Sequence, residues 1–323
     1  MSYGENDGAI GWLVGEENEG MRNMFTMMNN ARLSVGLQGL AITERAYQDA
    51  VQYANERRQG RAIGAPAGEQ SLIVEHPDVR RLLMTQRAWI DAMRALTYTN
   101  AAFLDMAKAA TDTEAARSWR EKADLYIPLS KSLCTDVAQE CTSSAVQIFG
   151  GMGYVEETGV AQHYRDARIL PIYEGTNGIQ AADLVGRKLG MRSGGVVHDE
   201  LSRFESMLDD VAKVDGMATA AENMREAISS SREATEHLVS VASNDPASLL
   251  ASSTPYLRML GTTVCAGLLA GSVVGLDPSN EFEAAKIASA RFFCEQLLPA
   301  AQGWASAVKM SSETLYAIPA DAF

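Results

Sequence analysis

The sequence has few of the residues that build metal or disulfide sites. Its 323 residues include only four cysteines and four histidines, and the cysteines show no CxxC spacing. Zinc in proteins is usually held by closely spaced Cys and His side chains, so we expect no metal site. Cys134 and Cys141 stand seven residues apart, which places them on one face of a helix. We interpret all four cysteines as reduced, structural residues of a cytoplasmic protein.

Long apolar runs and an excess of positive charge are missing as well. The apolar stretch 268–276 is far shorter than the ~18 residues that a bilayer requires, and the N-terminus has no signal-peptide pattern. The formal net charge of −13 argues against nucleic acid or an anionic membrane surface as a partner. We therefore expect a globular protein with no membrane span and no nucleic-acid partner.

Strand-like alternation is nearly absent, whereas apolar residues recur at helical spacing along most of the chain. From Val79 to Leu104 this spacing predicts one long amphipathic helix. Long helices are also predicted over 20–61 and 113–149, and Pro128 is expected to kink or interrupt the second of these. Shorter helices are predicted over 161–167, 179–189, 198–213, 216–242, 247–275 and 280–310.

These patterns divide the chain into four parts. Residues 1–16 contain GAIGWLV, the one stretch that favours a strand and turn. Residues 17–190 hold the long helices, 191–197 have the Gly and Ser content of a linker, and 198–323 form a second helical segment. The apolar residues of this last segment predict packing onto the main bundle or against another subunit. The predicted fold is all-α: a bundle of long helices with an appended helical domain.

The motif PIYEGTNGIQ, from Pro171 to Gln180, is the most informative part of the sequence. It places Glu174 where a helical pattern stops and a turn of Gly, Thr, Asn and Gly begins. A carboxylate on such a turn can project into a pocket, and desolvation in a dry pocket raises the pKa of a carboxylate enough to make it a usable base. A Glu in a turn can equally serve as a solvated cap, and the local sequence leaves both interpretations open.

Two polar clusters lie at the two ends of the first predicted long helix. MMNNAR places Asn29 and Arg32 near its start, and ERRQGR places Arg57 and Gln59 at its end. Arg57 follows Arg32 by close to a whole number of helical turns, so both are expected to face the same side. Guanidinium groups at a helix end suit phosphates, although they also complement the helix dipole without any ligand.

A further cluster, QIFGGMGY, follows the helix predicted over 113–149. Gln147 occupies its last turn, and the step from Gly150 to Gly151 allows a backbone to approach a ligand closely. The same pattern is also that of a simple helix C-cap. It is not a dinucleotide fingerprint, because no strand precedes it and the GxGxxG spacing is absent.

Taken together, these clusters resemble the C-terminal helical domain of acyl-CoA dehydrogenases over about residues 9–190. QIFGGMGY and RDARILPIYEGTNGIQ are highly specific to that family. The sequence is most similar to the branch that includes methylthiopropanoyl-CoA dehydrogenase, which carries an extra C-terminal domain. The resemblance implies a four-helix bundle, a remnant of the preceding β-domain over about 9–14, and FAD as cofactor.

The resemblance also implies a role for each cluster. Glu174 would remove the α-proton of an acyl-CoA thioester while the β-hydrogen leaves as hydride to FAD, giving the trans-2-enoyl-CoA. Contacts to the thioester and CoA are implied for Tyr173, Gly175, Asn29 and Arg32. Contacts to FAD are implied for Arg57 and Gln59 (the pyrophosphate of a neighbouring subunit's FAD), Gln147, Gly150 and Gly151 (the adenosine half), and Thr176 and Asn177 (the flavin). The sequence departs from the common family pattern at Gly60, Arg61 and Gly178.

The implied partners follow from the same resemblance. They are an acyl-CoA substrate, an electron-transfer flavoprotein as electron acceptor, and further copies of the chain in a homodimer or tetramer. The family's N-terminal helical domain and most of its β-domain have no counterpart here, so we expect a fragment or one half of a split enzyme, weakly active when isolated. Two alternatives remain: an acyl-CoA oxidase that uses O₂, and a non-catalytic helical subunit.

Overall fold

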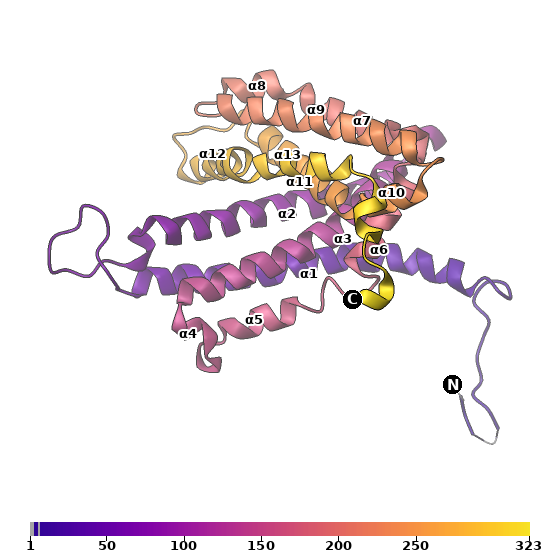
Figure 1. Cartoon of the computed structure of the whole chain (residues 1–323), viewed down its shortest axis with the longest axis horizontal. Coiled ribbons are helices and arrows are strands. Elements are labelled where there is room, and N and C mark those ends of the chain that lie inside the picture. The colour runs from indigo at the N-terminus through magenta and orange to yellow at the C-terminus, as the bar shows by residue number, and fades with distance from the viewer. Residues whose placement is uncertain (1–2, 6) are drawn as a thin grey trace.

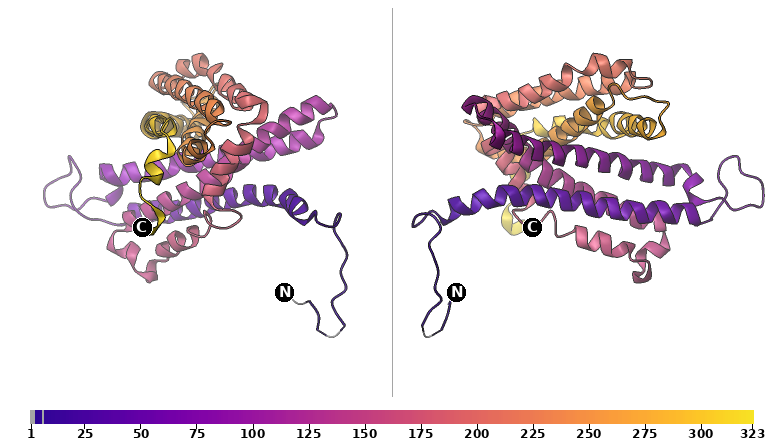
Figure 2. Two further views of the ribbon diagram at one scale, coloured as in Figure 1. Left: turned by 45° about the vertical axis from the view of Figure 1, so that its right-hand side comes forward. Right: turned by 180° about the vertical axis from the view of Figure 1, so that it is seen from behind.

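Three long helices form the base of the structure. The computed structural model describes residues 3–5 and 7–323, apart from the Thr26 side chain. In it α1 (Gly20–Glu56), α2 (Pro77–Ala109) and α3 (Thr113–Phe149) pack side by side, as Figures 1 and 2 show. The all-α fold expected from the sequence is confirmed.

The ends of α3 lie where the sequence places them. The Asp112 carboxylate accepts a hydrogen bond from the backbone N–H of Ala115 at 2.8 Å, which caps the start of the helix. Gly150 ends it with a φ of 61°, a conformation that glycine adopts without strain. The helix continues through Pro128, so the expected interruption does not occur.

Two glycines allow α1 to lie directly against the backbone of α3. A Cβ added to Gly36 would stand 2.6 Å from the carbonyl oxygen of Ser130, and one added to Gly39 would stand 2.8 Å from that of Cys134. No side chain fits at either position without a movement of the backbone. The two helices therefore hold the residues on either side of this contact at short range.

Shorter helices complete the first half of the chain. α5 packs beside α1 and α3, and α6 against α3. Their bounds are α4 (Gly151–Tyr154), α5 (Val160–Ala167) and α6 (Asn177–Asp183), which a π-helical turn continues over Leu184–Lys188.

The second half of the chain covers the α2 side of the bundle, in the upper part of Figure 1. Its helices are α7 (Gly195–Glu205), α8 (Leu208–Lys213), α9 (Ala218–Val241), α10 (Pro246–Ala251), α11 (Ser253–Ser272), α12 (Glu281–Phe292) and α13 (Pro299–Val308). One buried apolar cluster runs through both halves, and within it the rings of Trp89 and Phe293 meet edge to face at 4.7 Å. Of the two packing alternatives for this segment, the structure shows packing onto the bundle.

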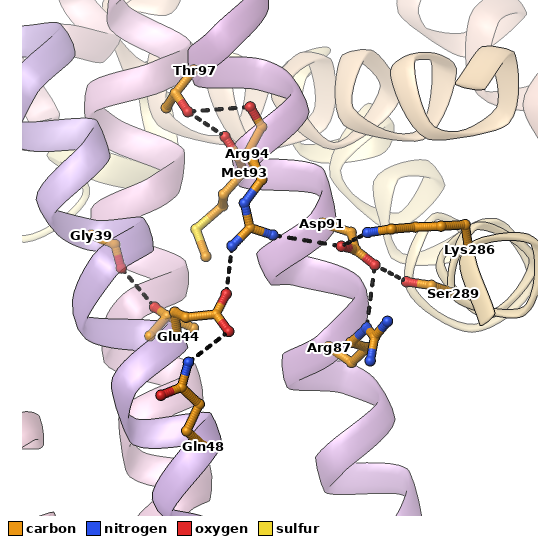
Figure 3. A network of polar contacts seen from close by, with 11 residues as sticks. Gly39, Glu44, Gln48, Arg87, Asp91, Met93, Arg94, Thr97, Lys286 and Ser289 are labelled. Atoms are coloured by element: carbon orange, nitrogen blue, oxygen red, sulfur yellow. Dashed lines mark hydrogen bonds and ion pairs between the residues drawn. The ribbon is translucent and has the colours of Figure 1, made fainter. Parts of the chain in front are cut away.

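A polar network crosses the same seam. The Asp91 carboxylate of α2 accepts hydrogen bonds from Lys286 and Ser289 of α12, while Arg94 bridges from Asp91 to Glu44 of α1 (Figure 3). Burial alone would raise the pKa of Asp91, but the hydrogen bonds and charges outweigh it, so the pKa lies below its ordinary value. Charge pairing and apolar packing thus join the two halves together.

The strand predicted near the N-terminus is not formed among the described residues. Residues 9–14 have no regular secondary structure, and Ile10 and Trp12 are 88% and 85% exposed. A strand needs a neighbouring strand to pair with, and none of the described residues offers one.

The first helix is shorter than the predicted 20–61. After Glu56 the chain turns back, and the backbone N–H of Gln59 donates to the carbonyl of Ser71 at 3.0 Å. Arg57 therefore has extended backbone and lies one residue beyond the helix, so the helical period that predicted its alignment with Arg32 does not extend to it.

The structure also differs from two other local predictions. The segment predicted as a linker over 191–197 is a turn over Met191–Gly194, in which Arg192 and Ser193 have left-handed backbone with φ of 50° and 52°, followed by the first turn of α7. The long stretches predicted over 198–323 divide into shorter helices, including a π-helical turn at Phe293–Leu297. Within the described residues, no helix combines the length and apolar content that crossing a bilayer requires.

Candidate active site

The turn that carries Glu174 connects α5 to α6 and is closed by local hydrogen bonds. The backbone N–H of Asn177 donates to the carbonyl of Pro171 at 3.0 Å, and the Thr176 hydroxyl caps α6 by accepting from Ile179 at 3.4 Å. Gln180 then reaches back, and its amide donates to the carbonyls of Glu174 and Gly175. These bonds define the path of the turn on both sides of the glutamate.

The closed turn holds Glu174 in an unusual backbone conformation. Its φ is 54°, and Gly175 follows with a φ of 82°. A left-handed conformation costs a residue with a Cβ roughly 1–2 kcal/mol, and such strain concentrates at functional sites. The side chain is half-buried, so the described residues do not fully enclose it, and among them no ion pair holds its carboxylate.

The turn is docked onto α1 through two contacts. The hydroxyl of Tyr173 donates to the side-chain oxygen of Gln38. Arg32, whose side chain is 2% exposed, lies beneath Gly175 and forms an ion pair with Asp183 of α6 at 3.2 Å. The Arg32 Nε is buried, and no described residue offers it a hydrogen-bond partner. The structure thus brings Tyr173, Gly175 and Arg32 together, with Asp183 as a partner that the sequence did not reveal.

Asn177 anchors the other end of the turn to α3. Its amide oxygen accepts from the Lys131 ammonium at 2.8 Å, and its amide nitrogen donates to Asp136 at 2.7 Å and to the Thr135 hydroxyl at 2.9 Å. Burial raises the pKa of the Asp136 carboxyl, and the hydrogen bond from Asn177 opposes this only partly. Lys131 and Asp136 were not among the residues predicted for the site.

The residues predicted to contact the adenosine and pyrophosphate gather in a separate pocket. Arg57, Gln59, Gln147 and Gly150 line a cavity of about 380 Å³ at the far end of α1, and Gly151 follows directly. The stacked rings of Tyr53 and Phe149, with centroids 4.1 Å apart, form part of its wall. His76 also lines the pocket, and its ring hydrogen-bonds the carbonyl of Gln59 at 2.8 Å.

The two groups of residues lie far apart in one chain. Asn29 and Arg32 belong to the part of α1 beside the Glu174 turn, whereas Arg57 follows its last residue. With a rise of 1.5 Å per residue, the 25 residues between the two arginines span roughly 37 Å. One small ligand cannot touch both groups within a single chain.

Comparison with known proteins defines the class of this chain. The family model "Acyl-CoA dehydrogenase, C-terminal domain" matches residues 18–189, and the model "Acetyl-CoA dehydrogenase C-terminal like" matches residues 200–319. The chain belongs to the acyl-CoA dehydrogenase family, as its motifs indicated.

Individual relatives support the same placement. The chain is 41% identical over 302 residues to the 3-methylmercaptopropionyl-CoA dehydrogenase of Ruegeria pomeroyi, a match that covers 91% of this chain and 51% of that protein. The expected branch of the family is thereby confirmed, and the chain spans about half the length of the curated relatives it matches.

Solved structures show the same fold. The Caenorhabditis elegans protein ACDH-11 in complex with C11-CoA aligns with a TM-score of 0.72 at 19% identity, covering 96% of this chain and 49% of that one. A Bacillus anthracis acyl-CoA dehydrogenase complexed with FAD aligns with a TM-score of 0.71 at 20% identity, covering 91% and 50%.

Proposed function

We propose that this chain is the C-terminal catalytic region of an FAD-dependent acyl-CoA dehydrogenase, and that Glu174 is its base. The Glu174 carboxylate would take the proton from the carbon next to the thioester carbonyl. Bound FAD would accept the β-hydrogen as hydride, so that the product is the trans-2-enoyl-CoA. The observation that carries this proposal is the strained turn, which presents on a rigid support a carboxylate that has no ion-pair partner among the described residues.

The backbone of the turn supports a second part of the reaction. No backbone hydrogen bond among the described residues uses the N–H of Glu174. This donor could therefore hold the thioester oxygen as negative charge develops there during proton removal. Tyr173, Gly175, Asn29 and Arg32 would position the thioester and the CoA moiety around it.

The residues at the far end of α1 fit the adenosine and pyrophosphate half of FAD. The pocket there combines a guanidinium group, two side-chain amides and the Gly150 step, where an added Cβ would meet no atom within 4 Å. Arg57 and Gln59 would contact the pyrophosphate, Gln147, Gly150 and Gly151 the adenosine, and Thr176 and Asn177 the flavin. Arg57 of this pocket lies roughly 37 Å along α1 from Arg32, which lies beneath the Glu174 turn, so we propose that each FAD is shared between two copies of the chain.

We further propose that turnover requires a larger assembly, with an electron-transfer flavoprotein as electron acceptor. Glu174 is only half-buried here, and a carboxylate base gains strength when water is excluded. The exposed apolar residues Ile10, Trp12 and Leu13 are also suited to contact with other protein. We also propose that residues 191–197 separate the helical domain 17–190 from the appended helical domain 198–323.

The test is a change of Glu174→Gln in the flavin-loaded enzyme that contains this chain. Gln keeps the shape of the side chain but cannot take up the proton, so turnover of acyl-CoA should fall by at least ~10³-fold. Glu157→Gln is the matched control, because Glu157 is exposed and should leave the rate unchanged. Near-normal turnover in Glu174→Gln would place the base elsewhere.

A further inference from the structure

Lys131 is an unusual residue for the middle of a helix bundle. Its side chain is 0% exposed, and it lies on α3 one residue after Ser130, whose backbone Gly36 of α1 approaches closely. Lysine is almost never fully buried unless it is paired, because its charged form loses solvation. The role of such a group is defined by the charges that surround it.

We propose that Lys131 is the positioning residue of Glu174: it fixes Asn177 and places a buried positive charge at the end of the turn that carries Glu174. This inference rests on the proposed role of Glu174 as the base. It adds a residue that would act through Glu174 and Asn177.

The first support is the orientation of the Asn177 amide. Its oxygen faces the Lys131 ammonium, and its nitrogen faces the Asp136 carboxylate. The reverse orientation would place NH₂ against an ammonium and the amide oxygen against a carboxylate. Lys131 and Asp136 therefore lock the first residue of α6, and with it the turn that precedes α6.

The second support is the set of charges around Lys131. Burial and the Arg32 guanidinium from α1 lower its pKa, and Asp136 and Glu174 raise it, with a net value of about 8. The Glu174 carboxylate is thus one of the charges that act on the Lys131 ammonium. Of the other neighbouring charges, Asp183 of α6 is paired with Arg32, while Arg258 of α11 and Arg168 act on Asp136.

The chemical consequence concerns the closed site. Bound substrate would expel water from around Glu174, which by itself favours the neutral carboxyl and removes the base. A fixed ammonium nearby opposes this, because the charged carboxylate is then the favoured form.

The experiment compares pH profiles of kcat/KM for the flavin-loaded enzyme and its Lys131→Met variant. The acid limb of the profile should move up by about one pH unit, so that activity falls roughly tenfold on the acid side and recovers at higher pH. Lys131→Arg should restore the original limb. Lys122→Met is the control, since Lys122 also lies on α3 but pairs with Glu200. An equal loss at every pH, or an unmoved limb, would overturn the inference.

A second measurement requires neither turnover nor a stable Lys131→Met protein. In Glu174→Gln, loss of the negative charge should lower the titration midpoint of Lys131, followed by NMR of ¹³Cε-labelled lysine and assigned with Lys131→Arg. An unchanged midpoint refutes the coupling. Normal turnover in Glu174→Gln together with a lower midpoint would contradict the proposed role of Glu174 as the base. It would still support the electrostatic coupling of Lys131 to Glu174.

Discussion

The contact between α1 and α3 can be tested by adding one methyl group. In Gly36→Ala the new Cβ would lie 2.6 Å from the carbonyl oxygen and 3.0 Å from the carbonyl carbon of Ser130, whereas ordinary contacts begin at 3.4 Å. The obstructing atoms belong to the backbone of α3, so no side-chain rotation relieves the clash. The two helices must move apart instead.

The magnitude follows from two opposing terms. Overpacking a tight core costs about 1–3 kcal/mol, and a contact with backbone belongs at the upper end of that range. Replacing glycine by alanine inside a helix returns about 1 kcal/mol. We therefore expect Gly36→Ala to lower the free energy of unfolding by about 2 kcal/mol.

Urea unfolding followed by circular dichroism measures this difference. Gly303→Ala in α13 is the matched control, because an added Cβ there meets no atom within 4 Å and should leave stability equal or slightly higher. If Gly36→Ala is as stable as Gly303→Ala, the two helices do not approach as closely as described.

Two further predictions concern buried titratable groups. Burial alone would raise the pKa of Glu200, but Arg203 and Lys122 outweigh it and lower the pKa, so its stabilisation is present above the unfolded value of about 4.5 and is lost as pH falls through the folded value. Glu200→Gln should therefore cost about 2 kcal/mol at pH 7, and urea unfolding should show this gap closing below about pH 4.5; a gap that stays constant would contradict the pairing. Burial also raises the pKa of Cys294 to about 12 and places those of the other cysteines higher still, so Ellman's reagent at pH 8 should find no reactive thiol in the folded chain and four after denaturation. Rapid labelling of the folded protein would show that these thiols are accessible.

The helices were predictable because their signals are local. α3 begins after a capping aspartate and ends at a glycine, and the apolar spacing between them has the helical period. The strand expected over 9–14 failed for the opposite reason, since a strand depends on a partner elsewhere. The early end of α1 has the same cause: residues after Glu56 pair with residues around Ser71, which the spacing within the helix cannot indicate.

The same difference between local and long-range signals explains which site residues could be predicted. The Glu174 turn was visible because its glycines, threonine and asparagine are turn residues in sequence. Asp183 was not, because it meets Arg32 across 151 residues. Lys131 was also missed, since a lysine within a helix usually lies at the surface, although its place between the buried Leu129 and Leu133 was a signal that could have identified it.

At Glu174, the residue that best suits the backbone is not the residue that the proposed chemistry needs. With a φ of 54°, this position would be most relaxed as glycine, which has no carboxylate. Heat resistance and proton abstraction therefore favour different residues at the same position. A programme that improves this protein by thermostability alone would include Glu174 among the positions to change, and would discard the group on which the proposed chemistry depends.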